Sequence, residues 1–309
     1  MTTAVAVRDA SDEPVPERGA RAAAAGVARA VLRNRKATLG LLLLVVITVI
    51  AAVPSLLAPG DPKAAIYDQQ VGPSLAHLLG TTQVGEDVFT QLIWGTRLTL
   101  VITVAVGVLV TAVSVLIGVT AAYVGGATDG ALSLLTDVFL IIPTLPLLIV
   151  LSTYLEGSGT IAIIAVLTAT GWAFSARQLR AQGLALRTRD FLEAARARGE
   201  RRRYIIVAEI LPNMLSLIVA SFLGSATYTV ATAAGLQFLG LGNSNDITWG
   251  TMLHYAQQNG ALESGNPWWA LAPGAAVAVL GTTFALLNYA FDEITNPALR
   301  PVRRGRPAA

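Results

Sequence analysis

Few of the 309 residues carry side chains that could do catalytic chemistry. The chain has no cysteine and only two histidines, and the lack of cysteine excludes a thiolate metal site, an iron–sulfur cluster and a cysteine nucleophile. No stretch matches the loop G-x-x-x-x-G-K-S/T that binds nucleotide phosphates. We therefore predict that this chain is not an enzyme, has no catalytic residue and no metal site, and binds no cofactor itself.

The most informative segment is the arginine-rich stretch 187–199. Asp190 and Glu193 resemble a capping box, with Asp190 as the N-cap and Glu193 at the third helical position. Gly199 suits the end of a helix, where the backbone needs a positive φ angle. The pattern predicts a helix of about eight residues, roughly 12 Å long, over 190–199.

This short helix needs support from another surface. Phe191, Ala194, Ala195 and Arg198 are spaced to share one face. Because so short a helix is marginal alone in water, something must hold it, and the small alanines let a partner approach closely. Two interpretations fit the pattern: a helix that docks on a protein, or an amphipathic helix anchored by anionic lipid headgroups.

The elements around this segment are predicted to cross a membrane. Hydrophobic residues make up 54% of the chain and charged residues only 13%, against roughly 25% charged in average soluble domains. A soluble protein of this size and whole-chain disorder are both disfavoured. A hydrocarbon core about 30 Å thick needs roughly 20 apolar residues of helix. The charge-free stretches predict an all-α polytopic protein with six transmembrane helices near 39–57, 99–124, 131–154, 159–180, 212–236 and 270–292.

The positive charges predict the orientation. All but two of the 22 lysines and arginines lie before the first span, between the fourth and fifth, or after the sixth. The exceptions are Lys63 and Arg97. Since cytoplasmic flanks carry the excess of Lys and Arg, both termini are expected in the cytoplasm of a cell whose plasma membrane holds the protein.

Four regions follow from these spans. We expect a flexible cytoplasmic tail over residues 1–36, then the first span and an outer loop over 37–97. A core of five spans covers 98–295, and a second cytoplasmic tail covers 296–309.

The third predicted span contains three unusual residues. Asp137 lies about 9 Å into it, where a carboxylate is costly, so it should face the bundle or reach a cytoplasmic arginine. Pro143 and Pro146 should kink this helix or pack passively. We expect a structural or gating role for Asp137 rather than contact with a substrate.

The basic loop and the start of the fifth span resemble a known motif. Glu193-Ala194-Ala195, Gly199 six residues after the glutamate, and Ile210-Leu211-Pro212 are similar to the EAA–G–I–LP motif. That motif marks the membrane subunits of binding-protein-dependent ABC importers. Leu79-Gly80-Thr81 before the second span and Phe238-Leu239-Gly240-Leu241-Gly242 after the fifth resemble the C-type subunits of the dipeptide/oligopeptide branch.

The resemblance implies a type I permease subunit that forms half of a pathway for di- or oligopeptides in an ATP-driven importer. It implies a homologous permease subunit as heterodimer partner, two cytoplasmic ATP-binding subunits or domains, and an external solute-binding protein. ATP and Mg²⁺ would be bound by the ATPases, membrane lipid would surround the bundle, and no nucleic acid is expected. The helix at 190–199 would transmit ATPase closure into alternating access. The coupling residues carried over are Asp190, Phe191, Glu193, Ala194, Ala195, Arg198, Gly199, Leu211 and Pro212.

Other functions stay open at this stage. Glu209, Glu86 and Thr82 depart from the usual pattern of the branch, so the same machinery could carry nickel chelates, glutathione or an oligosaccharide. A different class is an ion-coupled carrier or channel. Such proteins place ionisable residues near mid-membrane, and here only the off-centre Asp137 qualifies.

Overall fold

A computed structural model describes residues 34–154, 159–243 and 245–295. Over these ranges the chain is helical, and its one β-type feature is an isolated antiparallel bridge between Thr81 and Asp87. The all-α class predicted from composition is therefore confirmed. The predicted tails 1–36 and 296–309 lie outside the described residues, apart from positions 34–36.

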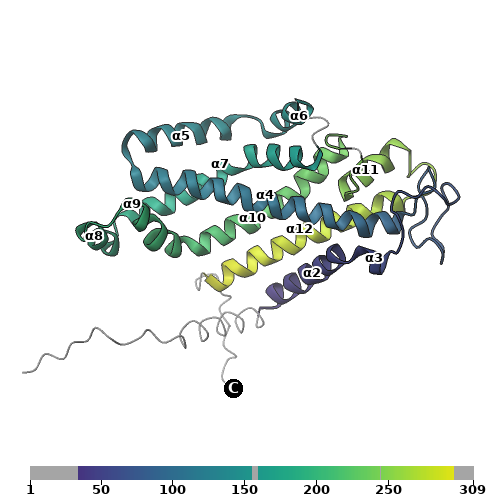
Figure 1. The fold of residues 1–309 in the computed structure, drawn as a ribbon, viewed down its shortest axis with the longest axis horizontal. Coiled ribbons are helices and arrows are strands. Elements are labelled where there is room, and N and C mark those ends of the chain that lie inside the picture. The colour runs from purple at the N-terminus through teal and green to yellow at the C-terminus, as the bar shows by residue number, and fades with distance from the viewer. Residues whose placement is uncertain (1–33, 155–158, 244, 296–309) are drawn as a thin grey trace, which may run out of the picture.

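Most of the helices run side by side along the long axis of the molecule (Figure 1). In chain order they are α2 (Arg35–Ala52), α3 (Pro54–Leu57), α4 (Val88–Val124), α5 (Gly126–Ile141), α6 (Thr144–Tyr154), α7 (Gly159–Arg187), α8 (Asp190–Ala197), α9 (Arg202–Tyr204), the π-helix η1 (Ile205–Ile210), α10 (Leu211–Phe238), α11 (Trp249–Gln258) and α12 (Trp268–Thr295). Five helical segments in the described part are long and apolar enough to cross a membrane. They become six if the bent pair α5 and α6 counts as one span.

Two spans are longer than their charge-free stretches predicted. The second begins at Val88 rather than near residue 99, because Asp87 caps it: the Asp87 Oδ2 accepts a hydrogen bond from the Thr90 backbone N–H at 2.8 Å. At 37 residues, α4 is about 55 Å long and extends well beyond a hydrocarbon core of about 30 Å. The fourth span likewise continues past residue 180 to Arg187.

The third span is not the single helix predicted over 131–154, and that prediction is wrong. Two helices, α5 and α6, meet there at 92°. Pro143 has no N–H and forces the preceding residue out of the helical region. Ile142 accordingly has an extended backbone, with φ −65° and ψ 128°. Pro146 lies in the first turn of α6, where a missing N–H costs nothing.

Helix α4 lies at the centre of the bundle and packs closely on α7 (Figure 1). A Cβ added at Gly118 would lie 2.4 Å from the Ala176 carbonyl oxygen, so only glycine permits this approach. Nearby, the Ser114 hydroxyl donates to the Trp172 carbonyl oxygen at 2.8 Å. The backbones of the two helices are therefore in direct contact at this point.

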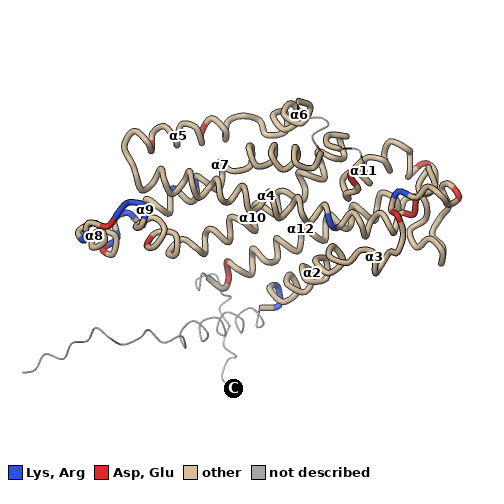
Figure 2. The backbone as a smooth tube through the Cα atoms, in the orientation of Figure 1, with Lys and Arg blue, Asp and Glu red and all other residues tan. Residues whose placement is uncertain are grey.

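The bundle has two chemically different ends. One end, here called the α8 end, holds α8, α9 and the last residues of α4 and α7. It carries a dense group of basic residues (Figure 2). The opposite α11 end holds α11 and the segment 58–87 (Figure 1). The start of α2 and the last turns of α12 lie together, joined by the Lys36–Glu293 ion pair at 2.5 Å.

Candidate functional site

Helix α8 forms where it was predicted, but its N-cap is a different residue. The N-cap is Arg189, whose carbonyl accepts from the N–H groups of Leu192 and Glu193 at 3.0 and 3.3 Å. The prediction that Asp190 is the N-cap is wrong, because Arg189 already has the extended backbone of a cap and Asp190 is the first helical residue. The carboxylates of Asp190 and Glu193 both lie in the first turn, where they interact favourably with the helix dipole.

Gly199 caps the C-terminal end of α8, as predicted. Gly199 has φ +75°. Its N–H donates to the Arg196 carbonyl at 2.9 Å, and the Glu200 N–H donates to the Ala195 carbonyl at 3.2 Å. These two bonds form a Schellman motif, which satisfies carbonyls that would otherwise be left open. The helix therefore stops at a fixed point.

One face of α8 is buried within the chain itself. Leu192 and Ala195 have no exposed surface. They pack in an apolar cluster, here called the α8 cluster, made of Val119, Tyr123, Leu179, Leu192, Ala195, Ile205, Ile210 and Met214. Burying a leucine side chain contributes about 1.5–3 kcal/mol, which a helix this short needs in order to stay folded.

The four residues predicted to share one face, Phe191, Ala194, Ala195 and Arg198, differ in their burial. Ala195 points into the α8 cluster, Phe191 is half-buried, and Ala194 and Arg198 are exposed. Leu192, which the prediction left out, is the main anchor, so the buried side of α8 is centred on Leu192 and Ala195. The surface that α8 offers to a partner consists of Glu193, Ala194, Ala197 and neighbouring charged residues.

A π-helix joins α8 and α9 to α10. Its six residues end at Ile210, and the Leu211 N–H donates to the carbonyl of Ile206, five residues back. Leu211 packs partly into the α8 cluster, whereas Pro212 is exposed at the start of α10. The Arg198 guanidinium lies 3.8 Å from the carboxylate of Glu209, so the end of α8 also contacts the π-helix by charge.

Two ion pairs hold α5 against α7. Asp137 pairs with Arg177 at 2.5 Å, and both side chains are about half exposed. Asp129, which sequence reasoning overlooked, accepts two hydrogen bonds from Arg180, at 2.6 Å from Nε and 2.8 Å from Nη2. The signal was present, because Asp129 is a charged residue at the edge of an apolar span.

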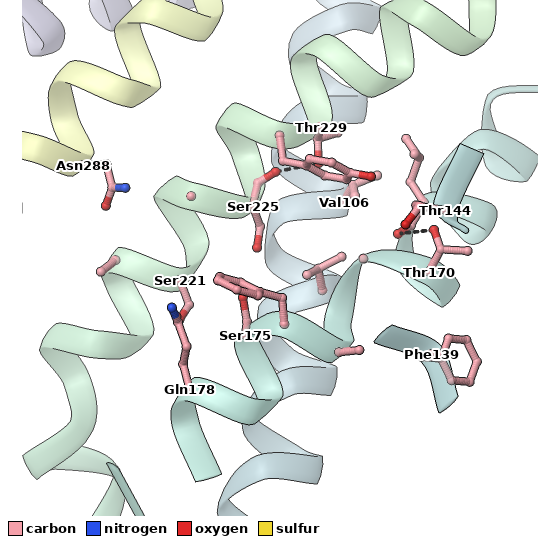
Figure 3. Close-up of a pocket in the computed structure, with 18 of the residues that line it drawn as sticks. Val106, Phe139, Thr144, Thr170, Ser175, Gln178, Ser221, Ser225, Thr229 and Asn288 are labelled. Atoms are coloured by element: carbon pink, nitrogen blue, oxygen red, sulfur yellow. Dashed lines mark hydrogen bonds between the residues drawn. The ribbon is translucent and has the colours of Figure 1, made fainter. Parts of the chain in front are cut away.

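A cavity of about 590 Å³ lies between α4, α5, α6, α7, α10 and α12 (Figure 3). Its wall is apolar with scattered hydroxyl and amide groups and one carboxylate, that of Asp292 on α12. Those labelled in Figure 3 include Ser175 and Gln178 from α7, and Ser221, Ser225 and Thr229 from α10. The Ser221 Oγ and the Asn288 Oδ1 are buried without a hydrogen-bond partner in the described part of the chain. Such groups favour a ligand that donates and accepts hydrogen bonds. Neutral polar residues inside helices carry no distinctive sequence pattern, so these were not predicted.

The structure brings only part of the predicted coupling set together. Phe191, Ala195 and Leu211 meet in the α8 cluster, and Asp190, Glu193, Ala194 and Arg198 lie on its surface. Asp137 lies outside the cavity. Across residues 34–154, 159–243 and 245–295, no three His, Asp or Glu side chains gather as metal ligands would.

Comparisons with known proteins define the class as a membrane permease. A family model described as binding-protein-dependent transport system inner membrane component matches residues 114–297. The chain is 30% identical over 282 residues to the oligopeptide transport system permease proteins OppC of Mycobacterium bovis and Mycobacterium tuberculosis, covering 90% of this chain and 96% of theirs. It is 28% identical over 274 residues to the dipeptide transport system permease protein DppC of Bacillus subtilis, covering 88% of this chain and 85% of that protein. The chain belongs to the family of binding-protein-dependent inner membrane transport components.

The two ion pairs between α5 and α7 give a prediction with an internal control. The Asp129–Arg180 pair is two-thirds or more buried and bidentate, so a double-mutant cycle with Asp129→Asn and Arg180→Gln should give a coupling of about 1–3 kcal/mol. The more exposed Asp137–Arg177 pair, tested with Asp137→Asn and Arg177→Gln, should give less than about 1 kcal/mol. Unfolding in mixed micelles with increasing SDS measures both. Equal coupling energies would contradict this ranking.

Proposed function

We propose that this chain is a permease subunit of an ATP-driven importer of di- or oligopeptides and forms half of its translocation pathway. The observation that carries the proposal is helix α8, which is anchored by Leu192 and Ala195 and keeps an exposed outer face. A helix that is fixed on one side and bare on the other suits transmission of force from a docked protein. The permease names of the relatives support the same function.

The proposal includes partner subunits that bind and hydrolyse ATP. Two cytoplasmic ATPase subunits or domains would bind ATP and Mg²⁺, and one of them would receive α8 in a groove. A homologous permease subunit would complete the pathway, and an external binding protein would deliver the peptide. This chain itself would bind no cofactor and hydrolyse nothing.

The coupling residues divide into two roles under this proposal. Leu192, Ala195, Phe191 and Leu211 attach α8 to the bundle. The exposed residues contact the ATPase: Asp190, Glu193, Ala194 and Arg198. Gly199 ends the helix and Pro212 begins α10, so these two residues fix the ends of the coupling segment.

The cavity would accept part of the peptide during transport. Its volume of about 590 Å³ lies within the usual range of small-ligand sites, roughly 300–1,000 Å³. Peptide backbones present N–H and C=O groups, which neutral hydroxyls and amides such as Ser221 and Asn288 can bind without selecting a side chain. That chemistry suits a pathway that must pass peptides of varied sequence.

The bent pair α5 and α6 would act as a movable wall of the pathway. Pro143 makes the break between them, Pro146 lies in the first turn of α6, and the Asp137–Arg177 pair holds α5 to α7 at an exposed contact. Closure and opening of a hinge need such a contact to break and re-form. A large coupling energy in the Asp137–Arg177 cycle described above would remove this gating role.

The coupling role predicts the effect of one added charge. In the purified assembly, Ala194→Glu should lower ATPase association and ATP-dependent uptake of a labelled tripeptide by at least about tenfold, because docking would bury an unpaired carboxylate. Ala195→Glu is a poorer test, since Ala195 is buried inside the chain. Co-purification and uptake into proteoliposomes measure the effect.

Two matched variants control this experiment. Ala194→Ser keeps a small neutral side chain and should transport normally. Ala65→Glu adds the same charge to an exposed alanine at the α11 end and should leave ATPase association unchanged. If Ala194→Glu associates and transports like the unchanged chain, α8 does not dock on the ATPase. Uptake of glutathione, a nickel chelate or an oligosaccharide in place of the tripeptide would instead overturn the proposal that the substrate is a peptide.

The proposed orientation puts the α8 end in the cytoplasm together with both termini. The excess of basic residues at that end supports it (Figure 2). Because the chain has no cysteine, single cysteines can map it without background. A membrane-impermeant maleimide should label Gln257→Cys in intact cells and Arg203→Cys, which lies outside the proposed docking surface, only after permeabilisation. Labelling in the reverse order would overturn the orientation.

A further inference from the structure

A second cavity, of about 440 Å³, lies at the α8 end where five helical elements meet. The last residues of α4 and α7, helix α8, the short helix α9 and the first residue of the π-helix η1 all contribute to it. Its polar wall consists of three arginines and one glutamate: Arg187, Arg196, Arg202 and Glu200. Its apolar wall is formed by Tyr123, Val124 and Ile205, of which Tyr123 and Ile205 are buried.

The charge of this cavity is unbalanced. Three guanidinium groups face one carboxylate, and none of the three forms an ion pair within the described residues. One carboxylate cannot balance three guanidinium groups, and the Glu200 carboxylate also lies 3.9 Å from the Nε of Arg198. The three arginines are exposed, so solvent screens part of their mutual repulsion, and a bound anion would compensate the remaining charge.

Two of the arginines are held in place by the fold. The Arg196 guanidinium lies over the ring of Tyr123, 5.7 Å from its centroid, and its Nη2 donates to the Arg187 carbonyl at 3.2 Å. The Arg187 guanidinium packs over Gly125, where an added Cβ would lie 2.6 Å from its Nη1. Preorganised guanidinium groups lose little freedom when they bind a planar or tetrahedral oxyanion.

We propose that this cavity binds a phosphate group, carried by an anionic phospholipid or by free phosphate. Several guanidinium groups that converge on one volume match the oxygens of phosphate through charge-assisted hydrogen bonds. The cavity begins at the last residue of α4 and of α7, two candidate membrane-spanning helices, which places it near the level of lipid headgroups. Its apolar wall beside Val124 suits the glycerol end of a lipid.

A bound phosphate would tie α8 to the bundle. It would bridge Arg196 of α8, Arg187 at the end of α7, and Arg202 of α9, which leads into the π-helix. This contact adds to the apolar anchoring by Leu192 and Ala195. The inference does not rest on the transported substrate or on the ATPase, because it concerns the isolated chain.

The test is ligand binding by the purified full-length chain in neutral detergent. Its thermal unfolding midpoint, followed by tryptophan fluorescence, is titrated with inorganic phosphate and separately with a short-chain phosphatidylglycerol, at ionic strength held constant with chloride. A ligand that binds the folded state raises the midpoint with a saturable dependence on concentration. We expect saturation in the unchanged chain.

Matched variants separate the cavity from general charge. Arg187→Gln with Arg196→Gln removes two cavity guanidinium groups, whereas Arg189→Gln with Arg203→Gln removes two arginines that are also exposed but lie outside the cavity. The apparent dissociation constant should rise at least about tenfold in the first and stay unchanged in the second. If the first fails to fold, Arg202→Gln, which leaves the Tyr123 and Gly125 contacts intact, should still weaken binding about tenfold.

Each outcome has a defined meaning. Saturation with both ligands assigns the site to the phosphate group itself, and saturation with phosphatidylglycerol alone assigns it to a lipid headgroup. No midpoint rise in the unchanged chain overturns the proposal. Equal weakening of binding in the cavity variant and the control variant overturns it as well.

Discussion

An eight-residue helix does not persist alone in water, and α8 persists because its inner side chains are buried in the chain that carries it. Leu192 and Ala195 fill the α8 cluster against the ends of α4 and α7, and the Schellman motif at Gly199 fixes where the helix stops. Because only one side of α8 is buried in the chain, its other side is exposed to solvent. A docking helix needs both properties, and the same few residues provide them.

The anchoring connects α8 to the cavity through short, closely packed steps. The α8 cluster includes residues of α4, α7 and α10, and these helices also line the cavity. Gly118 lets α4 and α7 approach until a methyl group would collide with the Ala176 carbonyl. Packed interiors of this kind transmit displacement rather than absorb it. A push on α8 would therefore move the cavity wall, and in the proposed function the bent pair α5 and α6 is the movable part of that wall.

Sequence reasoning worked where one local interaction decides the structure. Six apolar segments, the position of α8 and the positive φ of Gly199 follow from span length, turn chemistry and the motif spacing. Sequence reasoning failed where tertiary packing decides the structure. Leu192 and Ala195 are the buried residues of α8, and the N-cap is Arg189 rather than Asp190. The predicted effect of Pro143 was a kink within one helix, whereas the structure has two separate helices that meet at 92°. The polar groups of the cavity come from separate helices, and only the fold brings them together.

The central claim is that α8 moves as one rigid unit with the helices that anchor it, α4, α7 and α10. Double electron–electron resonance between spin labels at Arg189→Cys, the exposed N-cap of α8, and Leu116→Cys on the exposed face of α4 tests it in a transporter whose partner subunits carry no cysteine, because this chain has none of its own. We predict a single narrow distance distribution that is the same with and without nucleotide on the ATPase. A broad distribution, or one that shifts when nucleotide binds, would contradict the claim, because α8 would then move independently of the helices it is supposed to drive.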